Sequence, residues 1–206
     1  MLANNVPLAE YPRPQFKRDS YISLNGTWEY AIRDSNEFPS SFDGDILVPF
    51  SPETVKSGVN RFVNPTDYLF YKKEVSFPTQ FIKDYLIIHF GAVDQICDVY
   101  FNDKFMLHHE GGFLPFNVII NKRDVNENNI ISLRVKDYTD TSYYSRGKQK
   151  LTRGGIWYSP QSGIYMPVWC ESVKEGYIEE VKYTPDIDKQ VIKVLEIFSI
   201  MKVLFL

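Results

Sequence analysis

Short apolar runs alternate with turn residues from Trp28 to Pro185, and no long stretch of the chain shows helical periodicity. Runs of this length, bounded by Gly, Pro, Asn and Asp, are typical of strands. The pattern predicts strands over residues 27–32, 68–77, 85–90, 96–101, 105–109, 114–120, 129–135, 164–173 and 178–184. So many short strands predict an all-β protein with two packed sheets.

The alternation is clearest over residues 96–101, where Cys97, Val99 and Phe101 occupy one face of the predicted strand. Asn102 and Asp103 follow directly, and both residue types tolerate the positive φ that a tight hairpin needs. The sequence therefore predicts a β-hairpin here, with one apolar face of its first strand turned to the core.

Two segments lack this pattern: residues 1–24 are Pro-rich and irregular, and residues 137–161 form a long connection between strands. A loop of that length in a compact domain is more often a binding loop than a spacer. It combines polar donors, Gly pairs and aromatic residues. Proteins hold sugars with such groups, because C–H faces stack on rings while hydroxyls need donors and acceptors.

The end of the chain has a different character. A polar turn at 186–190 precedes a new apolar run, so we expect a domain over 1–185 with a Pro-rich N-terminal arm. Residues 186–206 are then the truncated start of a following domain or an aberrant tail. The run is too short and too charged for a membrane span of roughly 20 residues. It fits either an amphipathic helix or an orphan strand.

Composition narrows the class of protein. The chain has 206 residues, 44% of them hydrophobic and 24% charged, with a net charge of −3, as in an ordinary globular protein. Basic residues are scattered, so no basic stripe exists to bind a nucleic acid. Residues 1–14 lack the basic and apolar regions of a secretory signal. The compartment stays open, with the cytoplasm favoured, and we expect no membrane partner.

Other candidate chemistry has plain structural interpretations. Cys97 and Cys170 lie in apolar runs and are expected to be buried free thiols, with a disulfide between them as the alternative. Consecutive residues in 108–110 would point to opposite faces of a strand and cannot share a metal ion. Gly111 and Gly112 fit a bulge or turn. We expect no metal, no cofactor and no catalytic residue.

Several segments, in their order along the chain, carry a family resemblance. They are Tyr11-Pro12-Arg13-Pro14, Leu24-Asn25-Gly26-Thr27-Trp28-Glu29-Tyr30, Val48-Pro49-Phe50, Tyr71-Lys72-Lys73-Glu74-Val75, residues 90–94, 99–104 and 109–116, and Ser162-Gly163-Ile164 through Trp169. Together they resemble the N-terminal sugar-binding domain of glycoside hydrolase family 2, which includes β-galactosidases and β-glucuronidases. The likeness covers residues 11–185, and Tyr165 replaces one aromatic residue of the closing family pattern.

The resemblance implies a jelly-roll β-sandwich of the galactose-binding-domain-like type. In the family an immunoglobulin-like domain comes next, and then a barrel whose two glutamates, roughly 5 Å apart, hydrolyse glycosidic bonds with retention. We therefore expect the chain to be inactive alone, with these domains and carbohydrate as partners and homo-oligomer formation as a further option. Residues 195–206 do not resemble the corresponding segment of the family, so we expect a truncation or a shifted reading frame.

The resemblance also implies a site. One loop of the family's domain contacts the sugar in the subsite before the cleaved bond, and residues 140–158 match it. Donors from this loop would be Arg146, Lys148 and Gln149; Asp140 would accept hydrogen bonds and Trp157 would stack. For each, a solvated loop residue is the alternative.

A second candidate is Asn64, in the segment Val63-Asn64-Pro65-Thr66. It could bond a sugar hydroxyl, but Asn-Pro also favours a turn without any ligand.

Two classes of function are consistent with these patterns. The leading hypothesis is the carbohydrate-binding domain of a β-galactosidase- or β-glucuronidase-type glycoside hydrolase, without its catalytic barrel. The alternative is an autonomous glycan- or protein-binding module that uses the same sandwich loops.

Overall fold

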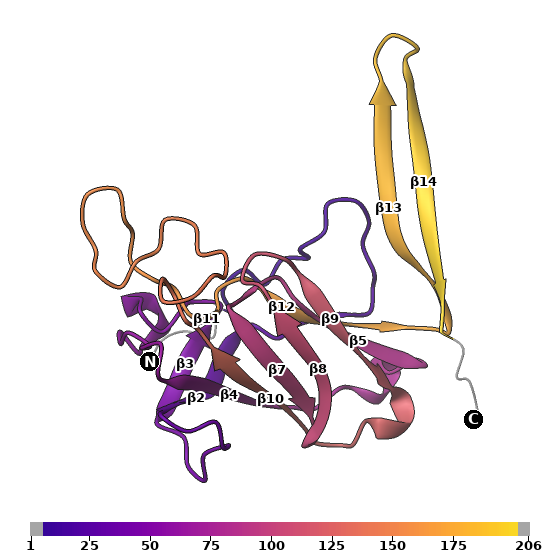
Figure 1. Cartoon of the computed structure of the whole chain (residues 1–206). Coiled ribbons are helices and arrows are strands. Elements are labelled where there is room, and N and C mark those ends of the chain that lie inside the picture. The colour runs from indigo at the N-terminus through magenta and orange to yellow at the C-terminus, as the bar shows by residue number, and fades with distance from the viewer. Residues whose placement is uncertain (1–5, 202–206) are drawn as a thin grey trace.

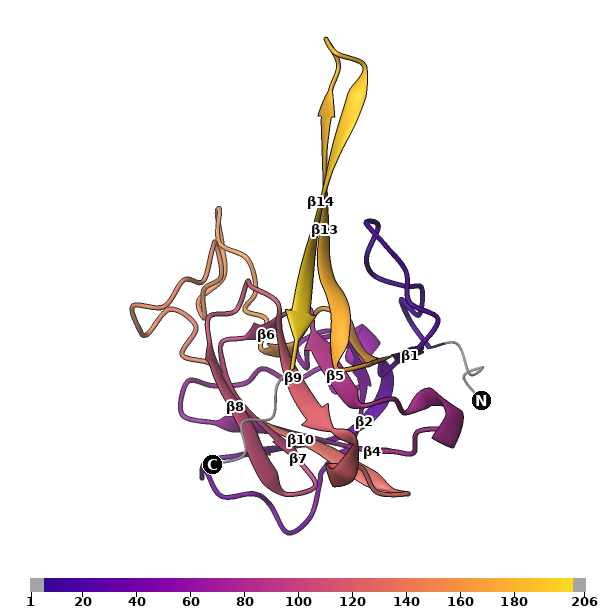
Figure 2. The same cartoon turned by 90° about the vertical axis from the view of Figure 1, so that its right-hand side faces the viewer.

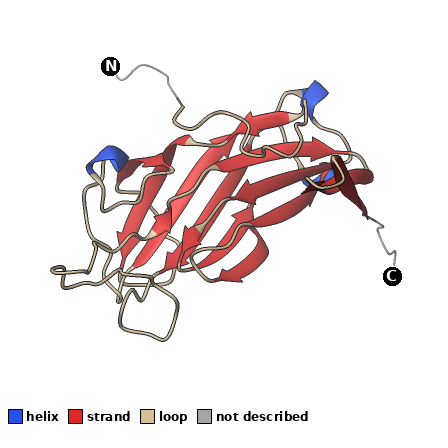
Figure 3. Cartoon of the chain, turned by 90° about the horizontal axis from the view of Figure 1, so that it is seen from above, coloured by secondary structure: helices blue, strands red, loops and turns tan. Residues whose placement is uncertain are grey.

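The protein is a β-sandwich in a computed structural model, which describes residues 6–201. One sheet has six strands in the order β3 (Gly44–Val48), β2 (Gly26–Arg33), β4 (Tyr68–Val75), β10 (Asn129–Lys136), β7 (Ile96–Phe101) and β8 (Lys104–Glu110). The other has β1 (Tyr21–Ser23), β12 (Val168–Val173), β5 (Tyr85–Phe90) and β9 (Phe116–Asn121). Figure 1 shows the two layers, and Figure 3 shows how completely strands dominate the chain.

Shorter elements complete the described chain. They are the pair β6 (Val93–Asp94) and β11 (Gly163–Ile164), the pair β13 (Gly176–Asp186) and β14 (Val191–Ile200), and the single-turn helices η1 (Val55–Ser57), η2 (Thr79–Phe81) and η3 (Lys122–Asp124). Within residues 6–201 no helix has the length and apolar character needed to cross a membrane. The predicted all-β sandwich is confirmed.

The core lies between the sheets and follows the predicted alternation. Cys97, Val99 and Phe101 of β7 are all buried. The chain then turns back into β8 through Asn102 and Asp103, whose φ angles of 49° and 62° are the positive values expected for the hairpin. Cys97 and Cys170 are buried free thiols on different sheets, so the disulfide alternative is wrong.

Some strand bounds differ from those predicted. The predicted strand 164–173 is divided into β11 and β12 by the segment 165–167, which includes Pro167 and so lacks one backbone donor. Neither β1 nor β3 was predicted. In both cases the strand is short, and pairing with a neighbour, β12 or β2, defines it.

The last described strands form a hairpin that projects from the sandwich, as Figures 1 and 2 show. β14 pairs with β13 over its whole length, so a helix at 191–200 is wrong. Residues 202–206 lie outside the described part of the chain. In the register of the hairpin, Ile192, Val194 and Phe198 lie opposite Pro185, Tyr183 and Ile178. The three β14 side chains are more than half exposed and give the hairpin an apolar face.

The N-terminal arm is fastened to the outer face of the four-stranded sheet by Glu171 of β12. The carboxylate of this residue is fully buried and accepts hydrogen bonds from Tyr11 and Arg13, with Arg18 Nε at 3.3 Å and His89 Nε2 at 3.0 Å. Burial alone would raise the pKa of Glu171, but the hydrogen bonds from His89 and Tyr11 and the charge of Arg13 lower it to about 2. We call these five side chains the Glu171 cluster.

Candidate functional site

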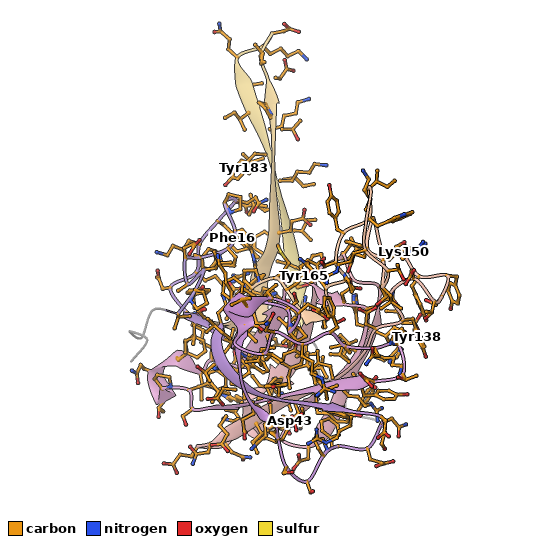
Figure 4. The ribbon with its side chains drawn as sticks, turned by 90° about the vertical axis from the view of Figure 1, so that its left-hand side faces the viewer. Phe16, Asp43, Tyr138, Lys150, Tyr165 and Tyr183 are labelled. Atoms are coloured by element: carbon orange, nitrogen blue, oxygen red, sulfur yellow. The ribbon has the colours of Figure 1, made fainter. Side chains whose placement is uncertain are left out.

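The long connection between β10 and β11, residues 137–162, stands at one end of the sandwich as two extended loops (Figure 1). It has little regular structure of its own. A parallel bridge joins Gln149 to Tyr158 and an antiparallel bridge joins Gly154 to Trp157. Lys150, labelled in Figure 4, lies on this loop, well away from the β13–β14 hairpin.

Gln149 ties the loop to the sandwich. Its Nε2 donates to Asp94 Oδ2 at 3.0 Å, and its Oε1 accepts from the backbone N–H of Gln161 at 2.6 Å. Both ends of this amide therefore have partners within the domain. The sequence predicts Gln149 as a sugar donor; the structure gives it an anchoring role in the loop.

Three buried or half-buried carboxylates lie beneath the loop, and sequence reasoning missed them. Asp137 accepts hydrogen bonds from the Ser162 hydroxyl at 2.7 Å and from the Thr139 backbone at 2.6 Å. Glu53 accepts from the Ser162 backbone N–H at 3.1 Å. Burial raises the pKa of all three, Asp94 included. The only sequence signal is an acid set within an apolar or turn segment, as in Val93-Asp94-Gln95-Ile96.

Asp94 is the most strongly perturbed of these acids. It is 2% exposed, and Gly112 packs so closely that any Cβ there would overlap the carboxylate. Burial and the charge of Asp137 raise its pKa from 3.8 to about 7, while the hydrogen bond from Gln149 works in the opposite direction. The anchor of the loop therefore includes a group that titrates near neutral pH.

This titration predicts a pH dependence of stability. Between pH 3.8 and about 7 the folded protein keeps a proton on Asp94 that the unfolded chain releases, so the free energy of unfolding should fall as pH rises through this window. Asp94→Asn should make that fall smaller, with Glu53 and Asp137 still contributing, and should be more stable above pH 7 by on the order of 2 kcal/mol. Urea unfolding at several pH values measures the free energy of unfolding of both proteins. Exposed Asp45→Asn is the control, and an unchanged slope in Asp94→Asn would contradict the assignment.

Two of the other loop candidates already take part in hydrogen bonds within the loop. Asp140 Oδ1 accepts from the Leu151 backbone N–H at 3.2 Å. Lys148 is exposed, and its backbone carbonyl accepts from Tyr158 at 2.8 Å. Arg146 is half-buried, and its Nε has no partner within residues 6–201.

Trp157 is the loop residue that the sequence predicts to stack on a sugar. Its ring is half-buried, with the Lys150 ammonium 5.2 Å from the ring centroid. This distance suits a cation–π contact. Lys150 is a cation that sequence reasoning missed; it lies beside the predicted Lys148 and Gln149. The loop thus carries one indole with an ammonium group close to it.

Asn64 lies in an exposed turn. Its backbone N–H and Nδ2 both donate to Asp67 Oδ2, at 3.0 and 2.9 Å. This is the turn chemistry named as the alternative. The segment nevertheless runs beside the long loop, because Arg153 lies over the Phe62 ring at 4.8 Å. The structure therefore brings the Asn64 segment and the loop together.

His108 and His109 contact different groups, as the alternation of a strand predicts. His108 contacts Asp98 and Glu110, whereas His109 Nε2 lies 3.0 Å from the Gly111 carbonyl. Gly111 has a φ of 107° and forms the expected turn. Across the described residues no group of three or more His, Cys, Asp or Glu is placed to hold a metal ion.

Comparison with known proteins gives one sequence match and many structural ones. The chain is 26% identical over 174 residues to the β-galactosidase of Thermoanaerobacter pseudethanolicus, covering 80% of this chain and 22% of that protein. No protein-family profile matches. The β-glucuronidase of Dictyoglomus thermophilum has a TM-score of 0.63 at 21% identity, covering 89% of this chain and 34% of that one.

A second solved structure agrees. The β-glucuronidase of Ruminococcus gnavus, in complex with an N1-substituted uronic isofagomine, has a TM-score of 0.64 at 18% identity, covering 92% of this chain and 36% of that one. The chain thus spans about a fifth to a third of the length of these proteins. Sequence and fold agree: this chain is similar in sequence to part of a larger β-galactosidase and in fold to part of larger β-glucuronidases.

Proposed function

We propose that the chain is the sugar-binding domain of a β-galactosidase- or β-glucuronidase-type hydrolase, and that loop 137–162 completes a sugar pocket whose catalytic groups lie on another domain. The observation that carries the proposal is the construction of the loop. Its base is fixed to the sandwich through Gln149 and Asp94, while Lys148 and Trp157 remain at least partly accessible. A fixed base with accessible donors and an indole suits a hydroxyl-rich ligand.

The roles divide between anchoring and contact. Gln149 and Asp140 hold the loop, and Lys148, Arg146 and Trp157 contact the sugar, with Asn64 beside them. Affinity of the domain alone is weak, because most of the sugar's partners belong to the rest of the enzyme. The domain alone does not hydrolyse glycosides, because the two catalytic glutamates are expected on the barrel.

A titration of the ¹⁵N-labelled chain tests this proposal. Methyl β-galactoside or methyl β-glucuronide should shift amide signals of residues 137–162, with a Kd in the millimolar range or weaker. Lys148→Ala should weaken the response, and Lys189→Ala, in the exposed β13–β14 turn, should not. Micromolar binding would favour the autonomous module instead. Turnover of a chromogenic galactoside by the pure chain would contradict the proposal that the domain is inactive on its own.

We also propose that the β13–β14 hairpin belongs to the domain that comes next in the larger enzyme. An isolated two-stranded hairpin is marginally stable in water, and the apolar face of this one needs a cover. In the chain alone that face should drive self-association. Ile192→Thr with Phe198→Thr should reduce it in sedimentation velocity, and Leu195→Thr, on the opposite face, should not. Equal effects of both changes would refute the assignment of the face.

A further inference from the structure

A cavity lies on the outer face of the four-stranded sheet, away from the long loop. Its volume is about 440 Å³, within the range of small-ligand sites. The walls are the N-terminal arm, the strands β5, β9 and β12, and the base of β13. Figure 4 shows Phe16, which lines this cavity, and Lys150 of the long loop on opposite sides of the view.

The floor of the cavity is a row of three side chains, those of Trp169, His89 and Asn117. The strand registers place Trp169 opposite His89 and His89 opposite Asn117, so all three share a face. The indole and imidazole rings stack with centroids 4.8 Å apart. Asn117 is exposed and offers both a donor and an acceptor.

The indole N–H of Trp169 is an unmet donor. Trp169 is 8% exposed, and its Nε1 has no hydrogen-bond partner within residues 6–201. Nε1 is itself closed to solvent, so Trp169 meets a ligand in the cavity through its ring and not through this donor. The group that a sugar hydroxyl can reach is the exposed amide of Asn117, which both donates and accepts.

The Glu171 cluster fixes the polar wall of the cavity in advance. Glu171 holds both Arg13 and His89, which line the cavity. Burial lowers the pKa of His89 below its usual value, and this favours the neutral imidazole. Phe16 of the arm also lines the cavity, and its ring is held by the guanidinium groups of Arg13 and Arg18, 4.9 and 4.8 Å from the ring centroid. On the side of the arm and of β5, a ligand therefore meets a wall that is already ordered.

The charges on the wall select against anions. The guanidinium of Arg13 is already paired with Glu171, and Glu179 and Glu180 add two exposed carboxylates at the rim. A uronate or a phosphate would be repelled there. We propose that this cavity is a second carbohydrate site, specific for an uncharged saccharide and separate from the long loop.

The test follows the indole N–H signal of Trp169 in the ¹⁵N-labelled chain, assigned through backbone connectivities, as lactose is added. The signal should shift progressively. Asn117→Ala should weaken the apparent affinity about three- to tenfold, the effect of one lost hydrogen bond. Ile119→Ala, on the same face of β9 but outside the cavity, should bind as the parent chain does. Sodium glucuronate should bind more weakly than lactose.

Three results would overturn the proposal: no shift of the Trp169 signal, equal affinity in the Asn117→Ala variant, or glucuronate binding as tightly as lactose. Lys148→Ala separates this site from the proposed function, because it alters the loop and leaves the cavity intact. Loss of the Trp169 response in Lys148→Ala would place the sugar in the loop and refute a second site. Loop signals that stay silent while Trp169 responds would refute only the proposed role of the loop.

Discussion

Glu171→Gln should lower the free energy of unfolding by about 3 kcal/mol, because breaking a buried ion pair leaves its partners without their counter-charge. Arg13 and Arg18 are only 19% and 15% exposed at their side chains, so water replaces the carboxylate poorly. Urea unfolding at pH 7 measures the loss. Glu175→Gln, an exposed glutamate four residues away, should change the free energy by less than about 0.5 kcal/mol.

The same variant has a distinctive pH signature. The folded pKa of Glu171 lies below its ordinary value, so its stabilising contribution is present above pH 4.5 and is lost as pH falls toward 2. The difference between the parent chain and Glu171→Gln should therefore shrink through this acid window. A difference that stays constant down to pH 2 would show that packing, and not charge, holds the arm.

Gly163→Ala should be as damaging, by roughly 2–4 kcal/mol, from overpacking and backbone strain together. Gly163 has a φ of 72°, and a Cβ there would lie 2.7 Å from Leu69 Cδ2 and closer still to the Tyr71 hydroxyl. Tyr71 is fully buried and accepts a hydrogen bond from the Ile164 backbone, so it cannot move aside easily.

Gly155→Ala separates the two causes. Gly155 has a φ of 59°, but no atom lies within 4 Å of the position that a Cβ would take, so only backbone strain applies, about 1 kcal/mol. Urea unfolding of both variants gives the comparison. If Gly163→Ala loses no more stability than Gly155→Ala, the close packing of β11 on Tyr71 is not a constraint on the fold.

The fold was largely predictable because a strand with one buried face can be identified from the alternation of apolar and polar residues alone. Cys97, Val99 and Phe101 show this, and the turn chemistry of Asn102 and Asp103 fixes the next strand. The run 191–200 was ambiguous, because its apolar residues satisfy both helical and strand periods. Only the partner strand β13 decides between them.

The site was less predictable, because its supports come from distant parts of the chain. The long loop and its candidates could be located from the sequence, but the bond from Gln149 to Asp94 spans 55 residues. No sequence pattern near Gln149 indicates that Asp94 is its partner. Glu171 gave a weak signal, a charge inside the otherwise uncharged run of β12, and its partners in the arm lie more than 150 residues earlier.

The Glu171 cluster has a consequence for synthesis in the cell. Tyr11 precedes Glu171 by 160 residues, and β1 likewise pairs with β12. During translation the amino-terminal segment therefore has no partner strand until β12, and with it nearly all of the sandwich, has left the ribosome. Closure of the domain is a late, long-range step, and such topologies fold slowly.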